Sequence, residues 1–148
     1  MRVSTKGRYG LRAMMDLAAN QKDEVPVFLA DIARRQGISE KYLEHIFAAL
    51  RAAGLVTTVR GRKGGFLLAR GPSETTVKDI IAVLEGPCVV VDCVSKPRTC
   101  KRAETCVTRD IWGLLGRKIE EVLSGYTLEQ LVEMQKEKSE KSTSMYYI

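Results

Sequence analysis

Hydrophobic residues recur at helical spacing in the first third of the chain. Residues 6–20 are predicted to form a helix whose apolar stripe consists of Tyr9, Ala13, Met14, Leu17 and Ala18. After Pro26, residues 27–29 form a short extended piece. A second helix is predicted over residues 30–36, and Gly37 separates it from a third helix. Ser39 is the predicted N-cap of this third helix, which ends near Ala53 before Gly54.

Two strands are predicted after this helical segment. Residues 55–59 and residues 66–69 have the β-branched and aromatic character of strands, and the basic, glycine-rich turn RGRKGG joins them. Two helices separated by a glycine and followed by a β-hairpin are typical of a winged helix-turn-helix. The predicted fold is therefore mainly α with a small β-hairpin wing.

The second half of the chain is again helical, with one interruption. Thr76 and Asp79 form a variant capping box that predicts a helix to about Glu85, which Gly86 and Pro87 end. A long helix is predicted from near Cys106 to near Ser124. Its apolar stripe could pack within the protomer or across a dimer, and dimerisation is favoured because a two-fold protein matches a palindromic DNA site. The stripe consists of Val107, Ile111, Leu114, Leu115, Ile119, Val122 and Leu123.

The predicted elements divide the chain into five segments. They are a winged helix-turn-helix (residues 1–72), a connecting helix (73–87), a cysteine loop (88–106), a dimerisation helix region (107–132) and a charged, Ser-rich tail (133–148). Residues 126–135 are expected to add only a short helical turn, and most of the tail is expected to be disordered.

Charge and composition bear on the kind of partner and on the cellular compartment of the protein. Residues 1–70 contain thirteen Lys or Arg and six Asp or Glu, so the excess positive charge of the chain (+6 overall) belongs to its first half. Such a domain can neutralise phosphates, although a merely soluble basic surface has the same composition. The sequence has neither an apolar run of transmembrane length nor a convincing secretory signal, so a cytoplasmic protein in a reducing environment is expected.

The third helix has one face suited to the core and another suited to reading DNA. The core face carries Tyr42, Leu43, Ile46, Phe47 and Leu50, while the opposite face carries Lys41, Glu44, His45, Ala48 and Arg51. Polar side chains near the start of a recognition helix contact base edges, and a Glu can accept a hydrogen bond from a cytosine amine. Glu44 could instead form a salt bridge with Lys41 or Arg51. His45, the only histidine, could contact a base or be an ordinary surface residue, and a metal-ligand role is less favoured.

Further DNA contacts are predicted outside this helix. In the hairpin turn, Arg60 is the candidate for entry into a narrow minor groove, while Lys63, with Arg62 beside it, is a candidate for phosphate contact. A solvated hairpin tip is the alternative. Near the start of the chain, Lys6 and Arg8 could hold a phosphate together with backbone amides of the first helix.

All four cysteines lie in one polar segment of nineteen residues. Cys88, Cys93, Cys100 and Cys106 are separated by four, six and five residues. Thiolates are ligands for zinc and for iron–sulfur clusters, and the absence of a close C-x-x-C pair favours a cluster over structural zinc. Cys106 also falls near a helix N-terminus, which favours its thiolate. A disulfide framework is less favoured in a reducing compartment.

The first 132 residues resemble the IscR/NsrR/RirA family of bacterial winged-helix regulators, and among them the IscR members. The matching segments are MRVSTKGRYGLRAMMDLA, DIARRQGISEKYLEHIFAALRAAGLV, VRGRKGGFLLAR and VKDIIAVLEG. The resemblance implies a homodimer with swapped or crossed long helices that binds double-stranded promoter DNA and carries a cluster in the loop before the long helix. It supports Glu44, His45 and Arg60 as readout positions, while Ser39, Lys41 and Tyr42 are DNA-binding candidates from their place on the third helix. It also implies an iron–sulfur cofactor, with [2Fe-2S] favoured over [4Fe-4S].

The resemblance assigns three cluster ligands and leaves the fourth open. The family's three cysteines correspond to Cys93, Cys100 and Cys106. IscR proteins often add a histidine three residues after the last cysteine, where this chain has Arg109, and related nitric-oxide sensors use an acidic residue of the first helix, where this chain has Arg8. Cys88 is a candidate fourth ligand, with a buried or redox-active thiol as the alternative. Other oxygen donors are Asp92, Glu104, Thr108 and Asp110, and an exogenous ligand is also open.

The favoured functional hypothesis is a cluster-dependent transcription regulator, implied by the resemblance to be a repressor of cluster-assembly genes when it carries its cluster. The alternative from another class is a cluster-free thiol switch, or a protein that binds DNA only with a partner. An iron–sulfur enzyme or electron carrier is disfavoured because the chain has no recognisable substrate motif, and no small-molecule substrate is expected.

Overall fold

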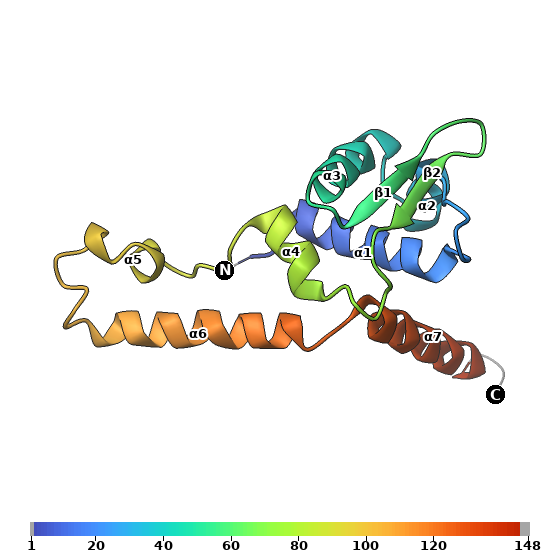
Figure 1. Ribbon diagram of the computed structural model, residues 1–148. Coiled ribbons are helices and arrows are strands. Elements are labelled where there is room, and N and C mark those ends of the chain that lie inside the picture. Colours follow the sequence, from blue (N-terminus) through green and yellow to red (C-terminus); the bar gives the residue numbers. More distant parts are fainter. Residues whose placement is uncertain (1, 146–148) are drawn as a thin grey trace.

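A helix-turn-helix followed by a β-hairpin forms the head of the protein, which the computed structural model describes over residues 2–145 (Figure 1). The predicted winged helix-turn-helix is confirmed, with boundaries within about two residues of those expected. Its elements are α1 (Thr5–Asn20), α2 (Leu29–Gln36), α3 (Glu40–Ala52), β1 (Val56–Val59) and β2 (Gly65–Leu68). Gly37 ends α2 in the left-handed conformation, with a φ of 64°.

The hairpin is a regular antiparallel pair with a short third segment along its edge. Val56 pairs with Leu68, and Val59 pairs with Gly65 next to the turn. The predicted extended piece is present, because the backbone of Val27 exchanges two hydrogen bonds with that of Phe66, at 2.9 and 2.8 Å. Gly65 permits this approach: its φ is 151°, and a Cβ there would overlap the carbonyl of Val27. The wing is therefore fastened to the segment that leads into α2.

One hydrophobic core lies beneath α3 and the hairpin. Its largest members are fully buried, and Phe47 packs edge-to-face on Phe66 with ring centroids 4.7 Å apart. The core draws side chains from α1, α2, α3, the hairpin, α4 (Val77–Glu85) and the start of α7 (Leu128–Met145). Its fully buried residues include Met14, Leu17, Ile32, Leu43, Ile46, Phe47, Leu50, Ile80 and Leu128.

A helical arm leaves the head and returns to it. The predicted capping box begins α4, because Thr76 and Asp79 exchange side-chain-to-backbone hydrogen bonds. The chain then passes through α5 (Asp92–Ser95) and a 3-10 turn, η1 (Pro97–Thr99), at the far end of the arm, and α6 (Val107–Ser124) runs back toward the head (Figure 1). Thr127 forms a β-bridge with Thr76 where α6 gives way to α7. The arm is thus tied to the head at the ends of α4 and α6.

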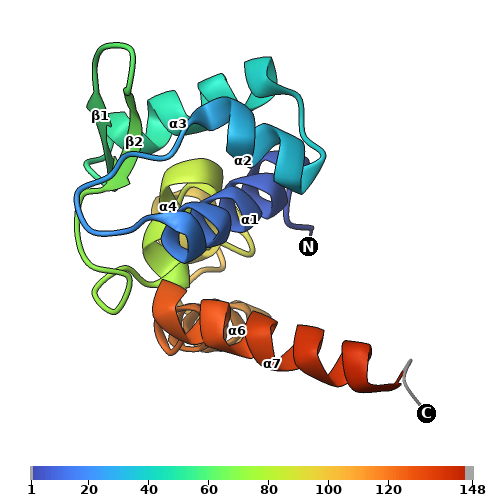
Figure 2. The same ribbon diagram turned by 90° about the vertical axis from the view of Figure 1, so that its right-hand side faces the viewer.

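The C-terminal segment differs from the expectation of a short helical turn followed by disorder. Helix α7 continues to Met145 and projects beyond the head, as Figure 2 shows. Thr127 and Gln130 cap its start, and Leu128 is fully buried, which anchors the first turn. The following Lys and Glu residues favour helix propagation, and the hydroxyls of Ser139 and Thr143 donate to carbonyls four residues earlier. The last three residues of the predicted tail, 146–148, lie outside the described part of the chain.

Within residues 2–145, none of the helices combines the length and apolar character needed to cross a membrane.

Candidate functional site

The outer face of α3 presents the predicted base-reading residues to solvent. Lys41, Glu44 and His45 are exposed, while Leu43, Ile46 and Phe47 are fully buried beneath them. Burial of one side of the helix therefore determines which side chains point outward. Ser39 is the N-cap, and its hydroxyl oxygen accepts a hydrogen bond from the backbone amide of Tyr42 at 3.2 Å. The Ser39 hydroxyl proton stays available to a ligand at the start of the helix.

Tyr42 differs from the other residues of this set. Its side chain is half-buried and packs edge-to-face against Tyr9 of α1, with ring centroids 6.1 Å apart. Because the ring is shared with α1, any DNA contact by Tyr42 is confined to its exposed edge and hydroxyl group. The residue belongs partly to the core face of α3, which the sequence pattern also indicated.

Glu44 lies in a shallow depression between α3 and the wing. Leu29, Glu40, Ala48, Arg51 and Phe66 line the same depression. Among the described residues, no salt bridge joins Glu44 to Lys41 or Arg51, the two partners that its spacing suggested. An exposed carboxylate without a cationic partner, beside the small side chain of Ala48, is suited to accept a hydrogen bond from a ligand that approaches α3.

The wing turn holds Arg60, Arg62 and Lys63 in exposed positions. The amide of Gly64 donates to the carbonyl of Gly61 at 2.9 Å and closes the turn. Gly61 has a φ of 107°, which favours glycine. The hairpin and α3 lie on the same side of the head in both views, opposite α7 (Figures 1 and 2). A recognition helix and a cationic wing therefore face one direction.

The N-terminus of α1 is occupied, contrary to the expected phosphate clamp. The carboxylate of Glu85, the last residue of α4, accepts hydrogen bonds from the amides of Ser4 and Gly7, both at 3.1 Å, and from the Ser4 hydroxyl. A carboxylate is favourable at this end of a helix, and it takes the amides that a phosphate would use. Lys6 is half-buried, and Arg8 lines a pocket with Pro87 and Cys88 near the cysteine loop. The two side chains stay candidates for DNA contact without those amides.

Glycines in α1 make this contact possible. A Cβ at Gly7 would overlap the Glu85 carboxylate, and a Cβ at Gly10 would overlap the side chain of Leu84. The end of α4 therefore lies directly on the backbone of α1. Since Glu85 precedes Cys88 by three residues, the cysteine loop begins at a point fixed to the first helix of the head.

The cysteine loop contains short helical turns instead of a continuous irregular segment. Cys93 lies in α5, Cys100 ends η1, and Cys106 is the N-cap of α6. Cys88 lines an apolar pocket formed by the start of α1, α4 and α6. All four thiols are free and partly exposed. No three Cys, His, Asp or Glu side chains within residues 2–145 are gathered closely enough to hold a metal ion.

Cys106 has the chemical environment of a reactive thiol. The hydroxyl of Thr108 lies 3.1 Å from its sulfur. This hydrogen bond, together with that from the backbone amide of Arg109, lowers the pKa of the Cys106 thiol below its ordinary value. The prediction that Cys106 lies at a helix N-terminus is confirmed. The nearby hydrogen-bond donors favour its thiolate form, which is the form that binds a metal or reacts with an oxidant.

Arg109 contacts the loop in a way that the sequence did not indicate. Its Nε donates to the carbonyl of Cys93 at 2.9 Å, and its Nη1 donates to the carbonyl of Ala103 at 3.2 Å. The side chain is half-buried. In the sequence, Arg109 marked only a departure from the family's histidine. The available signal was an arginine in the first turn of a helix that directly follows a long loop.

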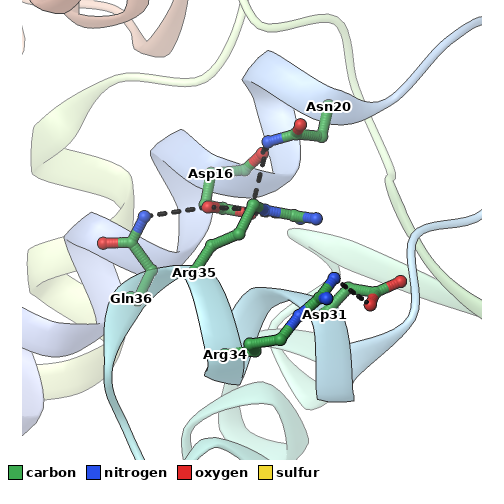
Figure 3. Close-up of polar contacts among 6 residues, drawn as sticks. All are labelled: Asp16, Asn20, Asp31, Arg34, Arg35 and Gln36. Atoms are coloured by element: carbon green, nitrogen blue, oxygen red, sulfur yellow. Dashed lines mark hydrogen bonds and ion pairs between the residues drawn. The ribbon is translucent and has the colours of Figure 1, made fainter.

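A polar network joins α1 to α2 within the head (Figure 3). The side chain of Asp16 is only 4% exposed and accepts hydrogen bonds from Arg35 Nε at 3.0 Å and from Gln36 Nε2 at 2.8 Å. The hydrogen bond to Asp16 raises the pKa of Arg35. Asp16 lies between Met15 and Leu17, and a charge within an apolar stripe is a sign that a buried partner exists. The packing of α1 on α2 determines which residue is that partner, so the local sequence pattern does not identify it.

Comparison with known proteins places these features in one family. A family model described as Rrf2, iron-dependent transcriptional regulator, matches residues 3–134. The HTH-type transcriptional regulator IscR of Photorhabdus laumondii is 42% identical over 135 residues, covering 91% of this chain and 81% of that protein. The solved structure of T. potens IscR is 45% identical with a TM-score of 0.73, covering 91% of this chain and 88% of that one. CymR, described as the global cysteine regulator of B. subtilis, is 40% identical with a TM-score of 0.75, covering 90% and 98%.

Proposed function

The chain belongs to the Rrf2 family of transcriptional regulators and is not an enzyme, and on this premise we propose that it is an iron–sulfur cluster-dependent DNA-binding regulator. Cluster occupancy in the loop of residues 88–106 controls how the winged head binds its operator. The observation that carries the proposal is the connection of a thiol-rich loop to the first helix of the head through Glu85. A change in the loop thereby reaches α1 through the Glu85 carboxylate, and α1 packs on the other helices of the head.

The donor set suits an iron–sulfur cluster in its chemistry. Cys93, Cys100 and Cys106 are the proposed ligands, each a free and partly exposed thiol, and thiolates are the usual ligands of such clusters. Because no three donors converge in the described residues, loading requires the three thiols to move toward one another. When bound, the cluster supplies a redox-labile centre of iron and sulfide, for which we favour [2Fe-2S]. The fourth ligand is assigned to none of the local candidates; Cys88 lines the apolar pocket between α1, α4 and α6.

The head supplies both sequence readout and affinity. We assign base readout to the exposed start of α3, with Glu44 as an acceptor for a cytosine amine and with Ser39 and His45 beside it. Arg60 is assigned to a narrow minor groove at the wing. Lys41, Arg62 and Lys63 are assigned to phosphates, and Tyr42 contributes its exposed edge. These roles are supported by the shared direction of α3 and the wing (Figure 1).

A homodimer is the proposed assembly. Apolar side chains of α6 stay exposed within the protomer, with exposed fractions of 72% for Val107, 55% for Ile111, 46% for Leu114 and 59% for Val122. Leaving such a stripe in water is unfavourable, and a second copy would cover it. Two heads related by a two-fold axis match a palindromic promoter site in double-stranded DNA.

The proposed targets are the genes of iron–sulfur cluster assembly, which the cluster-loaded form represses. Support comes from the similarity to proteins named IscR. Repression by the loaded form makes the regulator a product sensor: as clusters accumulate, the protein is loaded and further assembly is reduced.

DNA binding under anaerobic conditions tests the proposal. Fluorescence anisotropy would compare cluster-loaded and apo protein on a labelled duplex from the chain's own upstream region, with iron and sulfide measured on the same samples. Different affinities of the two forms support cluster control, and Ala at Cys93, Cys100 or Cys106 should remove both the visible absorption and the difference. Equal affinities with a bound cluster would contradict it. Salt concentration must be matched, because phosphate contacts make affinity salt-dependent.

A cluster-free thiol switch is the second candidate. It is favoured by four free, partly exposed thiols and by the similarity to CymR, described as a global cysteine regulator. In that case, oxidation or modification of the cysteines would change DNA binding directly. Anaerobically purified protein that contains no iron or sulfide, yet binds DNA differently when reduced and oxidised, would favour this function over the first.

A further inference from the structure

A single arginine spans the two halves of the cysteine loop. Arg109 lies in the first turn of α6, and its guanidinium donates both to the carbonyl of Cys93 in α5 and to the carbonyl of Ala103 between Cys100 and Cys106. Ala103 is the one buried residue of the loop, at 8% exposure. Both hydrogen bonds therefore hold points of the loop that are otherwise separated by nine residues of chain.

We propose that Arg109 is a positioning residue for the cluster ligands: it closes the cysteine loop through its backbone and so holds Cys93 toward the segment that carries Cys100 and Cys106. This inference rests on the proposed function, and it adds a residue outside the thiol set. Arg109 acts through the loop and is not itself a ligand, since a guanidinium stays protonated and has no lone pair to offer.

Arg109 binds backbone carbonyls and not the cysteine side chains, which makes this arrangement suitable for a ligand site. Among the described residues, the Cys93 and Cys100 sulfurs take part in no side-chain hydrogen bond, whereas the Cys106 sulfur is hydrogen-bonded near the start of α6. The clamp therefore restrains the chain through carbonyls and leaves the thiols of Cys93 and Cys100 free. Closing a loop in advance removes part of the conformational entropy that cluster binding must otherwise overcome.

Arginine is suited to this role for reasons of shape and charge. Its planar guanidinium presents five donors in a fixed fork and can reach two carbonyls at once, whereas lysine offers one compact ammonium on a flexible stem. The other cations of the loop, Lys96, Arg98, Lys101 and Arg102, are exposed, while Arg109 is half-buried. Its permanent positive charge is therefore held in place at the backbone of the cysteine loop.

Two substitutions separate the clamp from the charge. Arg109→Gln removes both, and Arg109→Lys keeps the charge but cannot span the two carbonyls. Arg117→Gln is the matched control, because Arg117 is an exposed arginine on the same helix with no hydrogen bond to the loop among the described contacts. All variants would be compared with the full wild-type chain.

The first measurement is amide hydrogen exchange of the reduced, iron-free proteins. Both Arg109 variants should speed exchange in residues 94–105 by about tenfold, as expected for loss of charge-assisted hydrogen bonds. Exchange in α1 and α3 should be unchanged, which reports that the head stays folded. The Arg117→Gln protein should match the wild type. Unchanged exchange of the loop in Arg109→Gln would overturn the clamp.

The second measurement is anaerobic reconstitution with ferrous iron and sulfide. The Arg109 variants should lose iron to a chelator about tenfold faster than the wild type, with altered iron–sulfur absorption bands, and Arg109→Lys should not restore retention. Retention equal to the wild type in both variants would overturn the positioning role. Failure of the wild-type chain to take up iron and sulfide would instead overturn the proposed function, and the exchange experiment would still decide whether the clamp exists.

Discussion

Asp16 and Arg35 join α1 to α2 through a carboxylate that is almost fully buried and a guanidinium that is one third exposed. Gln36 and Asn20 also donate to Asp16, so that the carboxylate accepts from both α1 and α2 (Figure 3). A buried charge that is satisfied in this way sets the angle between the helices. Its loss would therefore affect both stability and the presentation of α3.

Asp16→Asn should lower the free energy of unfolding by roughly 1–3 kcal/mol, because the charge-assisted hydrogen bonds are lost while the buried position stays polar. The exposure of Arg35 keeps the loss below that of a fully buried pair. Asp31→Asn is the control, since its ion pair with Arg34 is exposed on both sides (75% and 41%) and should contribute less than about 0.5 kcal/mol. Chemical denaturation measures both, and equal effects would contradict a special role for Asp16.

Glu44→Ala should relax sequence preference without changing the electrostatic part of binding. Discrimination at the contacted base pair should fall by about 1–3 kcal/mol, whereas the slope of log affinity against log salt should not change. Lys63→Ala should do the opposite: it should weaken binding to all sequences and reduce the salt slope by about one. Binding titrations on an operator and on single-base variants distinguish the two. If the Glu44→Ala protein keeps the base preference of the wild type, Glu44 is an ordinary surface residue with no role in base readout.

The Cys106 thiol should react at lower pH than an ordinary cysteine. Its pKa is lowered chiefly by the Thr108 hydroxyl, so more thiolate is present at any pH below the ordinary value of 9.0. Thr108→Val should remove this donor, raise the pKa and move the midpoint of the alkylation rate to higher pH. Rates for the iron-free protein would be followed by mass spectrometry of the peptide that contains Cys106. A midpoint that does not move would show that Thr108 has no part in the shift.

Ile111→Asp should dissociate the proposed dimer while leaving the protomer folded. Ile111 is 55% exposed in the protomer, so its replacement removes little from the core. At a two-fold interface, two buried charges would appear together, and dimer affinity should fall by at least about a hundredfold. Sedimentation analysis measures the change. Lys118→Ala on the same helix, where Lys118 pairs with Glu121, is the control that should leave assembly intact.

Local patterns predicted most of the head. The division of α3 into two faces, the capping box of Thr76 and Asp79 and the N-cap of Ser39 each depend on residues within one or two turns, and the structure reproduces all three. The glycine-rich turn likewise predicted the hairpin, because its backbone requirements are local. Such features can be predicted from a single sequence because the interacting groups are neighbours along the chain.

The contacts that tie the parts together were not predictable in the same way. Glu85 caps a helix that begins some eighty residues earlier, and Arg35 reaches Asp16 across two helices. The carbonyls that Arg109 binds carry no side-chain signature. Residues 133–145 looked disordered because they are charged and polar, yet the buried Leu128 and the Thr127 cap start a helix that continues through them. In each case tertiary packing determines which residue is the partner, whereas the local sequence pattern indicates at most that a partner exists.

The bridge between Thr76 and Thr127 makes α6 a lever with one end held at the head. Its eighteen residues span about 27 Å, so Cys106, at the other end of the helix, lies a full helix length from that point. In a two-fold dimer joined along α6, a rotation of each head about its lever changes the angle between the two heads by twice that rotation. Small movements at the cysteines would then change the distance between the two heads. Binding to a palindromic operator depends on that distance, because it must match the spacing of the half-sites.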